Sequence, residues 1–356
     1  MNCSEDELQY YSYGDQYLCG YTNILTCIIG AFFHTSIIVV YTRKNMISSM
    51  NTVLVHSSAV TLLSTIVYLP HSWHEFIRAN LYTIEKHRQE SWEIISLYSW
   101  HLNAVLSYTS TGIAIMMGVW RYIAVIHPLK ERYWCNMRNT RIAIAALYAV
   151  AIVALIPAIN EMKIVETYKI LGLDGFMAKN CTAGNRTKIY EMKIQIEDND
   201  FAYFVTFIWY GLLLKTLPSI FLGAISLKLI LALRKAKNFR QQVTITRSQS
   251  KPNSRSSKTT RTDPTDRTTK MLLMILAIFI ISELPDGIFC TLTAFRGKEF
   301  FHKYYYPSWE LITTLVQVCD NLNFIVFYTM SNQFRVTFKA LFRKRNGDMS
   351  DSPANT

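Results

Sequence analysis

Long apolar stretches alternate with short polar and charged ones along most of the chain. Seven stretches of about 20 residues or more are dominated by apolar side chains, and they cover residues 21–41, 53–77, 94–126, 142–159, 201–233, 271–294 and 311–330. A helix of about 20 apolar residues spans the hydrocarbon core of a bilayer. The pattern therefore predicts an all-α membrane protein in which seven transmembrane helices form a bundle.

The chain just after the seventh apolar stretch has a different pattern. Apolar and basic side chains interleave there at helical spacing: Phe334, Val336, Phe338, Leu341 and Phe342 with Arg335, Lys339 and Arg343. A helix with one apolar and one basic face lies along a membrane surface instead of crossing it. We therefore expect a short amphipathic helix on the inner leaflet after the seventh span.

The distribution of charge predicts the orientation of the bundle. Lys and Arg cluster after the first stretch, between the third and fourth, between the fifth and sixth, and after the seventh. With seven spans these segments share one side of the membrane, which the positive-inside rule makes cytoplasmic. We expect a multi-pass plasma-membrane protein with its N-terminus outside and its C-terminus inside. Basic loops facing anionic lipid account for the net charge of +12, so no nucleic-acid partner is expected.

The expected domain organisation follows from these segments. Residues 1–20 form an extracellular tail, residues 21–345 the seven-helix domain and residues 346–356 a cytoplasmic tail. Within the domain, residues from about 238 to 264 are poor in apolar side chains and rich in Ser, Thr, Lys and Arg, which predicts a disordered loop. The acidic first twenty residues lack Lys and Arg, so we expect no separate signal peptide.

Three sequons for N-glycosylation fall on the predicted outer side, at Asn2, Asn180 and Asn185. Asn2 lies in the tail, and the other two lie in the long segment of about residues 160–200, which has charges of both signs. A loop of that length is usually functional or disordered. We expect these three sites to be glycosylated and the loop to act as a lid.

A single arginine stands near the end of the third apolar stretch, in the sequence Trp120-Arg121-Tyr122. Since arginine is costly in hydrocarbon, it must reach the interface, face the bundle interior or find a partner. The tripeptide resembles the Asp-Arg-Tyr element of rhodopsin-like G-protein-coupled receptors, and Asn323 to Phe327 resembles their Asn-Pro-x-x-Tyr element. The resemblance implies that Trp120, Arg121, Tyr122, Asn323 and Phe327 serve coupling to a heterotrimeric G protein. Because Trp120 replaces the acid beside Arg121, we expect raised basal signalling.

The residues after this arginine narrow the resemblance. His-Pro-Leu-Lys-Glu-Arg begins at residue 127 and Trp-Cys-Asn-Met-Arg at residue 134, and Ser-Glu-Leu-Pro stands at 282–285. Together they resemble the myosuppressin and sex-peptide branch of invertebrate peptide receptors. Receptors of that branch bind FMRFamide-like neuropeptides that end in Arg-Phe-amide. The resemblance therefore implies an extracellular amidated neuropeptide as the ligand.

Two polar positions depart from the rhodopsin-like pattern. His34 stands where helix one usually has an Asn, and Thr61 stands where helix two usually has an Asp. Without that carboxylate we expect no sodium site of the usual kind. Two readings of His34 stay open: a hydrogen bond to Thr61 that replaces the lost polar contact, or a purely structural role.

The cysteines also depart from the family pattern, because Ser96 occupies the place of the usual bridging Cys in helix three. Cys3, Cys19 and Cys181 fall on the outer side, where disulfides form. The alternatives are a bridge from Cys19 or Cys3 to Cys181, and free thiols. Connectivity does not follow from sequence alone.

Ionisable residues inside the apolar stretches mark a candidate ligand site. Glu283 and Asp286 are three residues apart and share one face of helix six, and Lys215 lies deep in helix five. The two acids would bind the arginine of the peptide, with His71 and Glu75 at the outer mouth. In the alternative, Lys215 and Glu283 neutralise each other and the ligand binds elsewhere. Both hold if the peptide arginine competes with Lys215.

Other classes of function have less support in the sequence. A transporter usually has internal repeats with broken helices in matching positions, and none is seen here. The histidines have no spacing typical of metal sites, and no catalytic constellation is recognisable. We therefore expect no enzyme, no metal site and no cofactor, and we keep a transporter or a non-peptide orphan receptor as the alternatives.

Overall fold

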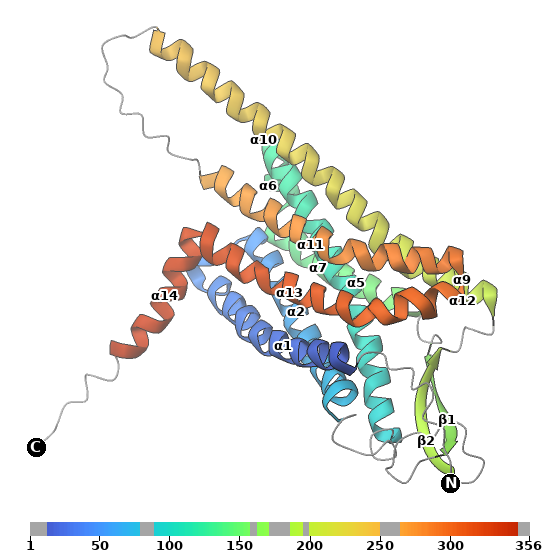
Figure 1. Ribbon diagram of the computed structural model, residues 1–356. Coiled ribbons are helices and arrows are strands. Elements are labelled where there is room, and N and C mark those ends of the chain that lie inside the picture. The colour runs from blue at the N-terminus through green and yellow to red at the C-terminus, as the bar shows by residue number, and fades with distance from the viewer. Residues whose placement is uncertain are drawn as a thin grey trace, which may run out of the picture.

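Seven helical stretches in the computed structural model are long and apolar enough to cross a membrane: Gly20–Tyr41, Ser49–Ile77, Glu90–Ile126, Met137–Ala154, Asp200–Lys235, Thr269–Arg296 and Lys298–Met330. The structure describes residues 13–78, 89–156, 162–170, 186–194, 199–249 and 264–347, and the spans lie within these ranges. Each span overlaps one of the seven predicted stretches. The predicted seven-helix bundle is confirmed (Figure 1).

The first four spans are simple in outline. α1 (Tyr13–Tyr41) is joined to α2 (Ser49–Ser72) by the short turn η1 (Lys44–Met46), and α2 continues into the π-helical turn η2 (Trp73–Arg78). The third span is α5 (Glu90–Ile126), followed by the short α6 (Pro128–Trp134), and the fourth is α7 (Met137–Ala154).

The last three spans contain changes of helical winding. The fifth consists of α9 (Asp200–Phe207), the π-helical η4 (Ile208–Thr216) and α10 (Leu217–Gln249). The sixth is α11 (Pro264–Arg296). The seventh consists of α12 (Lys298–Phe300), the π-helical η5 (Phe301–Tyr305) and α13 (Tyr306–Met330), and the amphipathic helix is α14 (Asn332–Gly347).

Short polar side chains cap the starts of three helices. The Ser48 hydroxyl accepts the N–H of Asn51 before α2, and the Asn136 side chain accepts the N–H of Asn139 before α7. Asn199 accepts the N–H groups of the first turn of α9. Each cap satisfies a backbone donor that the helix itself leaves open. The caps explain why the second, fourth and fifth spans begin where they do.

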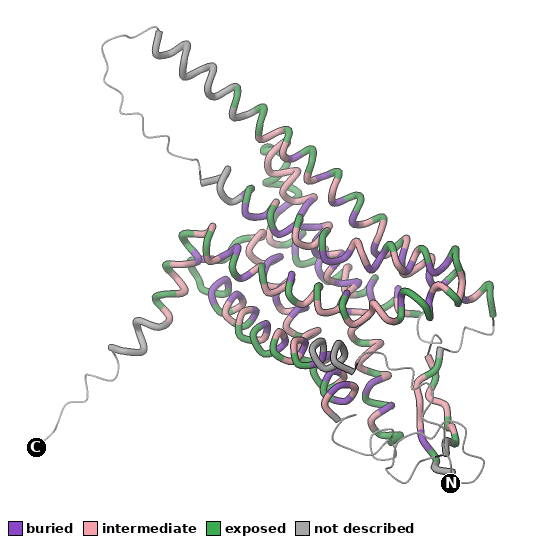
Figure 2. The backbone as a smooth tube through the Cα atoms, in the orientation of Figure 1, coloured by how far each residue is buried: buried purple, intermediate pink, exposed green. Residues whose placement is uncertain are grey.

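The surface of the bundle is apolar over most of its length. At most 44% of the residues in any span's apolar window are buried, and many exposed residues are large and apolar, such as Leu25, Phe32 and Val150. Figure 2 shows the buried positions on the inner sides of the helices and exposed positions around them. A soluble protein rarely exposes apolar surface on this scale. The exposed surface matches a bilayer as solvent and supports the multi-pass membrane assignment.

The segment predicted to be a long loop contains a β-hairpin. β1 (Met162–Ile170) pairs antiparallel with β2 (Arg186–Ile194), in a register that aligns Met162 with Ile194 and Ile170 with Arg186. Across the strands the Lys188 ammonium lies 2.7 Å from a Glu166 carboxylate oxygen. The hydrogen bonds of Glu166 with Lys188 and Tyr168 lower the pKa of its carboxyl. Of the two readings of this segment, functional or disordered, the second does not hold for the residues of the two strands.

The hairpin and α14 mark the two ends of the bundle (Figure 1). β1 and β2 contact α5 at one end, which we call the hairpin end, and α14 contacts α13 and α1 at the other, which we call the α14 end. α10 continues as a helix to Gln249, well into the stretch that we expected to be disordered from about residue 238. Residues 250–263 lie outside the described part of the chain.

Candidate functional site

Three ionisable side chains meet inside the bundle between the fifth and sixth spans. The Lys215 ammonium of η4 lies 2.9 Å from a Glu283 carboxylate oxygen and 2.6 Å from an Asp286 oxygen, both on α11. The exposed fractions of Lys215, Glu283 and Asp286 are 5%, 6% and 3%. Three of the five predicted ligand residues thus form one buried cluster, which we call the charged triad.

Tyrosine hydroxyls and a thiol complete the surroundings of Asp286. The Tyr305 hydroxyl donates to Asp286 Oδ1 at 2.8 Å, and the Tyr210 hydroxyl lies 3.4 Å from Oδ2. The Cys290 thiol lies 2.9 Å from the Tyr305 oxygen, and the Lys215 ammonium lies 5.1 Å from the centre of the Tyr210 ring. Asp286 is therefore held by more groups than Glu283. The sequence did not indicate Tyr210 or Tyr305, because no local pattern relates either to Asp286.

Two glycines allow the fifth and sixth spans to come close enough for the triad to form. A Cβ atom added to Gly211 would lie 2.5 Å from the Cβ of Cys290, and one added to Gly287 would lie 2.7 Å from the Thr216 hydroxyl. Such distances are well below van der Waals contact, so a larger residue would push the helices apart. The π winding of η4 around Lys215 is a second local feature, and π turns are frequent at functional sites.

The triad is electrostatically unbalanced. When all three groups are ionised, two carboxylates face one ammonium and one negative charge remains. Removing one partner of a buried ion pair destabilises a protein by about 3–5 kcal/mol. The contacts match the expected alternative in which Lys215 neutralises Glu283, with Asp286 as a further partner. They leave an acidic site that an additional cation could occupy.

The other two predicted ligand residues, His71 and Glu75, lie at the hairpin end of the second span. The His71 ring Nδ1 is 3.3 Å from the hydroxyl of Ser96, the residue in place of the usual cysteine. Glu75 lies in η2, with a carboxylate oxygen 3.9 Å from His74 Nδ1. The tilted rings of Trp100 and Trp309 lie nearby with 4.8 Å between their centres, and with His71 they border a small cavity of about 30 Å³. The sequence had not indicated these two tryptophans.

At the α14 end, the arginine motif links three spans. Arg121 Nη2 donates to the Thr269 hydroxyl of α11 at 2.6 Å, and Trp120 Nε1 donates to the Thr140 hydroxyl of α7 at 3.1 Å. The side chain of Tyr122 faces the His127 ring, with 6.4 Å between ring centres. Arg121 thus has a partner inside the bundle, although the acid of the related motif is absent.

The end of the seventh span is packed by aromatic rings. Phe327 is 2% exposed, and its ring lies 5.4 Å from Tyr41 and 5.9 Å from Phe334 of α14. Phe324, at the position of the usual proline, stacks on Phe33 at 4.4 Å. The buried Asn323 Oδ1 has no hydrogen-bond partner among the described residues. Apolar packing therefore stands here in place of a polar network around a tyrosine hydroxyl.

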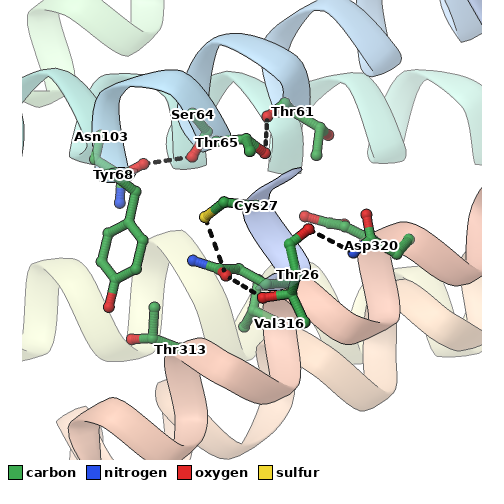
Figure 3. A pocket seen from close by; sticks show the side chains of 12 residues that line it. Thr26, Cys27, Thr61, Ser64, Thr65, Tyr68, Asn103, Thr313, Val316 and Asp320 are labelled. Carbon is green, nitrogen blue, oxygen red and sulfur yellow. Dashed lines mark hydrogen bonds between the residues drawn. The ribbon is translucent and has the colours of Figure 1, made fainter. Parts of the chain in front are cut away.

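A polar cavity of about 60 Å³ lies between α1, α2, α5 and α13 (Figure 3). Thr61 lines it, and its hydroxyl donates to the Ser57 carbonyl of its own helix. Neither ring nitrogen of His34 has a hydrogen-bond partner in the described part of the chain, so of the two readings of His34 the bond to Thr61 is not formed. The cavity does contain a carboxylate, since Asp320 of α13 lines it. The sequence alone had not indicated Asp320 as a lining residue.

The predicted modification sites fall outside what the structure describes. Asn2, Asn180, Asn185, Cys3 and Cys181 lie in undescribed segments, and Cys19 lies in α1 without a described side chain. Glycosylation and the alternative disulfides stay predictions. Of the described cysteines, Cys27, Cys135 and Cys319 are buried thiols.

Comparison with known proteins identifies the family. The model of the serpentine type 7TM GPCR chemoreceptor Srw family matches residues 21–345. The chain is 26% identical over 325 residues to the Sex peptide receptor-related protein 2 of Caenorhabditis elegans, covering 88% of this chain and 69% of that protein. It is 26% identical over 356 residues to the G-protein coupled receptor dmsr-1 of the same organism, covering 90% and 67%.

A third relative is the Sex peptide receptor of Drosophila melanogaster, with 23% identity over 343 residues, covering 94% of this chain and 74% of that protein. The matched residues include all seven spans and both the charged triad and the Arg121 contact. These proteins are signalling receptors and not enzymes. The chain belongs to the Srw family of seven-transmembrane G-protein-coupled receptors.

Proposed function

We propose that this receptor binds an extracellular neuropeptide ending in Arg-Phe-amide, of the FMRFamide-like or myosuppressin type, and activates a heterotrimeric G protein. The observation that carries the proposal is the charged triad, a buried site in which two carboxyl groups share one ammonium. Two of the compared relatives have the sex peptide in their names, which supports a peptide as the class of ligand.

The peptide arginine enters the triad by exchange with Lys215. A guanidinium forms two parallel hydrogen bonds with a carboxylate, whereas an ammonium is a point charge. Glu283 is the carboxylate that exchanges partners, because Tyr305 and Tyr210 also hold Asp286. Lys215 then keeps Asp286 as its partner. The Lys215–Glu283 ion pair is thus the ligand-free state, and the contact between Glu283 and the peptide arginine is the ligand-bound state.

The terminal phenylalanine of the peptide has an aromatic environment close to the triad. The ring of Tyr305, which holds Asp286, lies 5.7 Å from the ring of Trp309, and the Trp309 ring lies 4.8 Å from that of Trp100. Aromatic pairs of this kind contribute about 0.5–1.5 kcal/mol beyond area burial. His71 borders the same small cavity, so it and the neighbouring Glu75 are proposed as contacts at the mouth of the site.

The hairpin end is the proposed extracellular end, and β1 and β2 form part of a lid. The basic segments at the α14 end support this orientation by the positive-inside rule. The sixth span connects the triad with the α14 end, because α11 carries Glu283 and Asp286 in the middle part of the span and Thr269 at its start. A movement of α11 on ligand binding at the triad would therefore break the Arg121–Thr269 hydrogen bond. Arg121 would then be available to contact the G protein.

A test of this proposal is a screen of amidated Arg-Phe peptides on cells that express the receptor and report G-protein activation. Each active peptide is compared with an analogue in which citrulline replaces the arginine, which removes the charge and keeps the shape. We expect activation by the arginine peptide and a potency at least tenfold lower for citrulline. Equal potency of the two peptides would rule out the triad as the arginine site. Inactivity of the whole series would contradict the ligand class.

A further inference from the structure

Three side chains with metal-binding atoms meet at the hairpin end, on η2 and the first turn of α5. His74 Nδ1 lies 3.9 Å from a Glu75 oxygen, and His74 Nε2 lies 3.9 Å from a Glu93 oxygen. One ligand atom from each residue can be chosen so that all three lie within 4.8 Å of one another. From this geometry we infer that His74, Glu75 and Glu93 form a Zn²⁺ site between the second and third spans.

The local fold positions the three ligands. Successive residues of an α-helix point about 100° apart, but η2 is π-helical and has more residues per turn, which brings His74 and Glu75 closer in direction. The His74 ring packs edge-on against Trp92 at 5.4 Å between centres, which fixes its orientation. Glu93 lies one residue after Trp92 and approaches the ring from α5. The two spans thus contribute ligands to one point.

The distances are close to those that zinc requires. Zn–N and Zn–O bonds of about 2.0–2.2 Å put the ligand atoms of a tetrahedral site roughly 3.4 Å apart. The two 3.9 Å distances involve different nitrogens of the His74 ring, and a metal binds only one of them. Within a set of one ligand atom per residue the separations reach at most 4.8 Å, roughly 1.4 Å above the tetrahedral value, and rotation of the side chains closes that difference. One imidazole and two carboxylates fill three positions and leave the fourth for water.

Burial and donor chemistry also favour a metal ion. His74 and Glu93 are 0% exposed, whereas the Glu75 side chain is 24% exposed and gives access from the surface. An imidazole nitrogen in the donor set favours Zn²⁺ over Ca²⁺ or Mg²⁺, which prefer oxygen alone.

Bound zinc would tie η2 to α5 beside His71, at the mouth of the proposed ligand site, and would hold Glu75 there as one of its ligands. The inference depends on the three side chains and not on which peptide binds. No local sequence motif announces this site, because Glu93 is far from His74 along the chain and belongs to another helix. For that reason the sequence alone does not indicate a metal here.

The test uses the purified full-length receptor with any polyhistidine tag removed and metals stripped by a chelator. Zn²⁺ alone is titrated against a competing fluorescent zinc chelator, and the melting temperature is followed in parallel. We expect one zinc ion per receptor and a melting temperature that rises with zinc. The isosteric Glu93→Gln variant and His74→Asn should weaken zinc binding at least tenfold, and Ca²⁺ should not compete.

His101→Asn serves as the matched control, since His101 of α5 bonds to the Leu97 carbonyl of its own helix and lies outside the three ligands. It should bind zinc like the parent chain. Should His74→Asn or Glu93→Gln fail to fold, the partly exposed Glu75→Gln variant tests the same site and should also weaken binding. Parent-like zinc affinity in the folded ligand variants, or no zinc binding by the parent, overturns the inference.

Discussion

The Arg121 guanidinium donates a hydrogen bond to the Thr269 hydroxyl at 2.6 Å and thereby joins α5 to α11. Both residues lie at the α14 end, and 148 positions separate them in the chain. The neighbouring Trp120 carries no charge and bonds to Thr140 instead. A neutral hydroxyl therefore holds the arginine of the proposed coupling motif.

Thr269→Val should raise ligand-independent signalling several-fold. A hydrogen bond to a charged group contributes about 1.5–3 kcal/mol, which corresponds to a shift of roughly tenfold or more between two conformations. The ligand-independent signalling is measured as basal G-protein activation at equal surface expression. Thr293→Val is the control, because Thr293 is as buried on the same helix but bonds to the Phe289 carbonyl. Basal activity no higher in Thr269→Val than in this control would count against the restraint.

Gly211→Ala should lower the melting temperature of the purified receptor by several degrees. The new Cβ would lie 2.5 Å from the Cβ of Cys290 and 2.7 Å from the backbone nitrogen of Thr291. Overpacking of this kind costs about 1–3 kcal/mol. At Gly223 nothing lies within 4 Å of an added Cβ, so Gly223→Ala should be neutral or stabilising. Equal melting temperatures for the two alanine variants would refute the close approach of the spans.

Lys215→Met should destabilise the receptor more than the double variant Lys215→Met with Glu283→Gln. The single change leaves two buried carboxylates without their shared cation, at a cost of about 3–5 kcal/mol. The Glu283→Gln change removes the charge of one carboxylate and with it the repulsion between the two carboxylates. A double-mutant cycle on melting temperatures, with all four proteins measured in one buffer, gives the coupling. Strictly additive effects would show that the pair does not interact in the folded receptor.

Phe327→Tyr restores the residue found in the related motif, yet it should lower stability by about 1–3 kcal/mol. Phe327 is 2% exposed and is packed against the rings of Tyr41 and Phe334. The added hydroxyl would be buried among aromatic carbons. Tyr328→Phe, a change of the same size at a less buried ring, should have little effect. A tyrosine variant as stable as its parent would mean that the cluster has room and a partner for the hydroxyl.

The sequence predicted the spans well because a membrane requires long apolar helices, and their lengths are visible in one dimension. It also located Arg121, Lys215, Glu283 and Asp286, since ionisable residues are rare within such stretches. The β-hairpin was missed, although residues 164–170 and 186–194 contain runs of β-branched and aromatic side chains. Interspersed charges hid that signal within a long connecting segment.

Partners from distant helices could not be predicted. Tyr305 lies 19 residues beyond Asp286, and the two meet only because η5 packs beside α11. The same holds for Thr269 beside Arg121 and for Glu93 beside His74. Each contact depends on how two helices are placed relative to one another, and no periodicity within either helix contains that information.

The central claim is that Glu283 accepts the arginine of the peptide in place of Lys215. Its most direct test is the potency of an active amidated Arg-Phe peptide on Glu283→Gln at equal surface expression. Glu299→Gln, at an exposed acid of α12 at the same end, is the control. We predict a loss of at least tenfold in potency for Glu283→Gln and none for Glu299→Gln. Unchanged potency and signalling in Glu283→Gln would contradict the account.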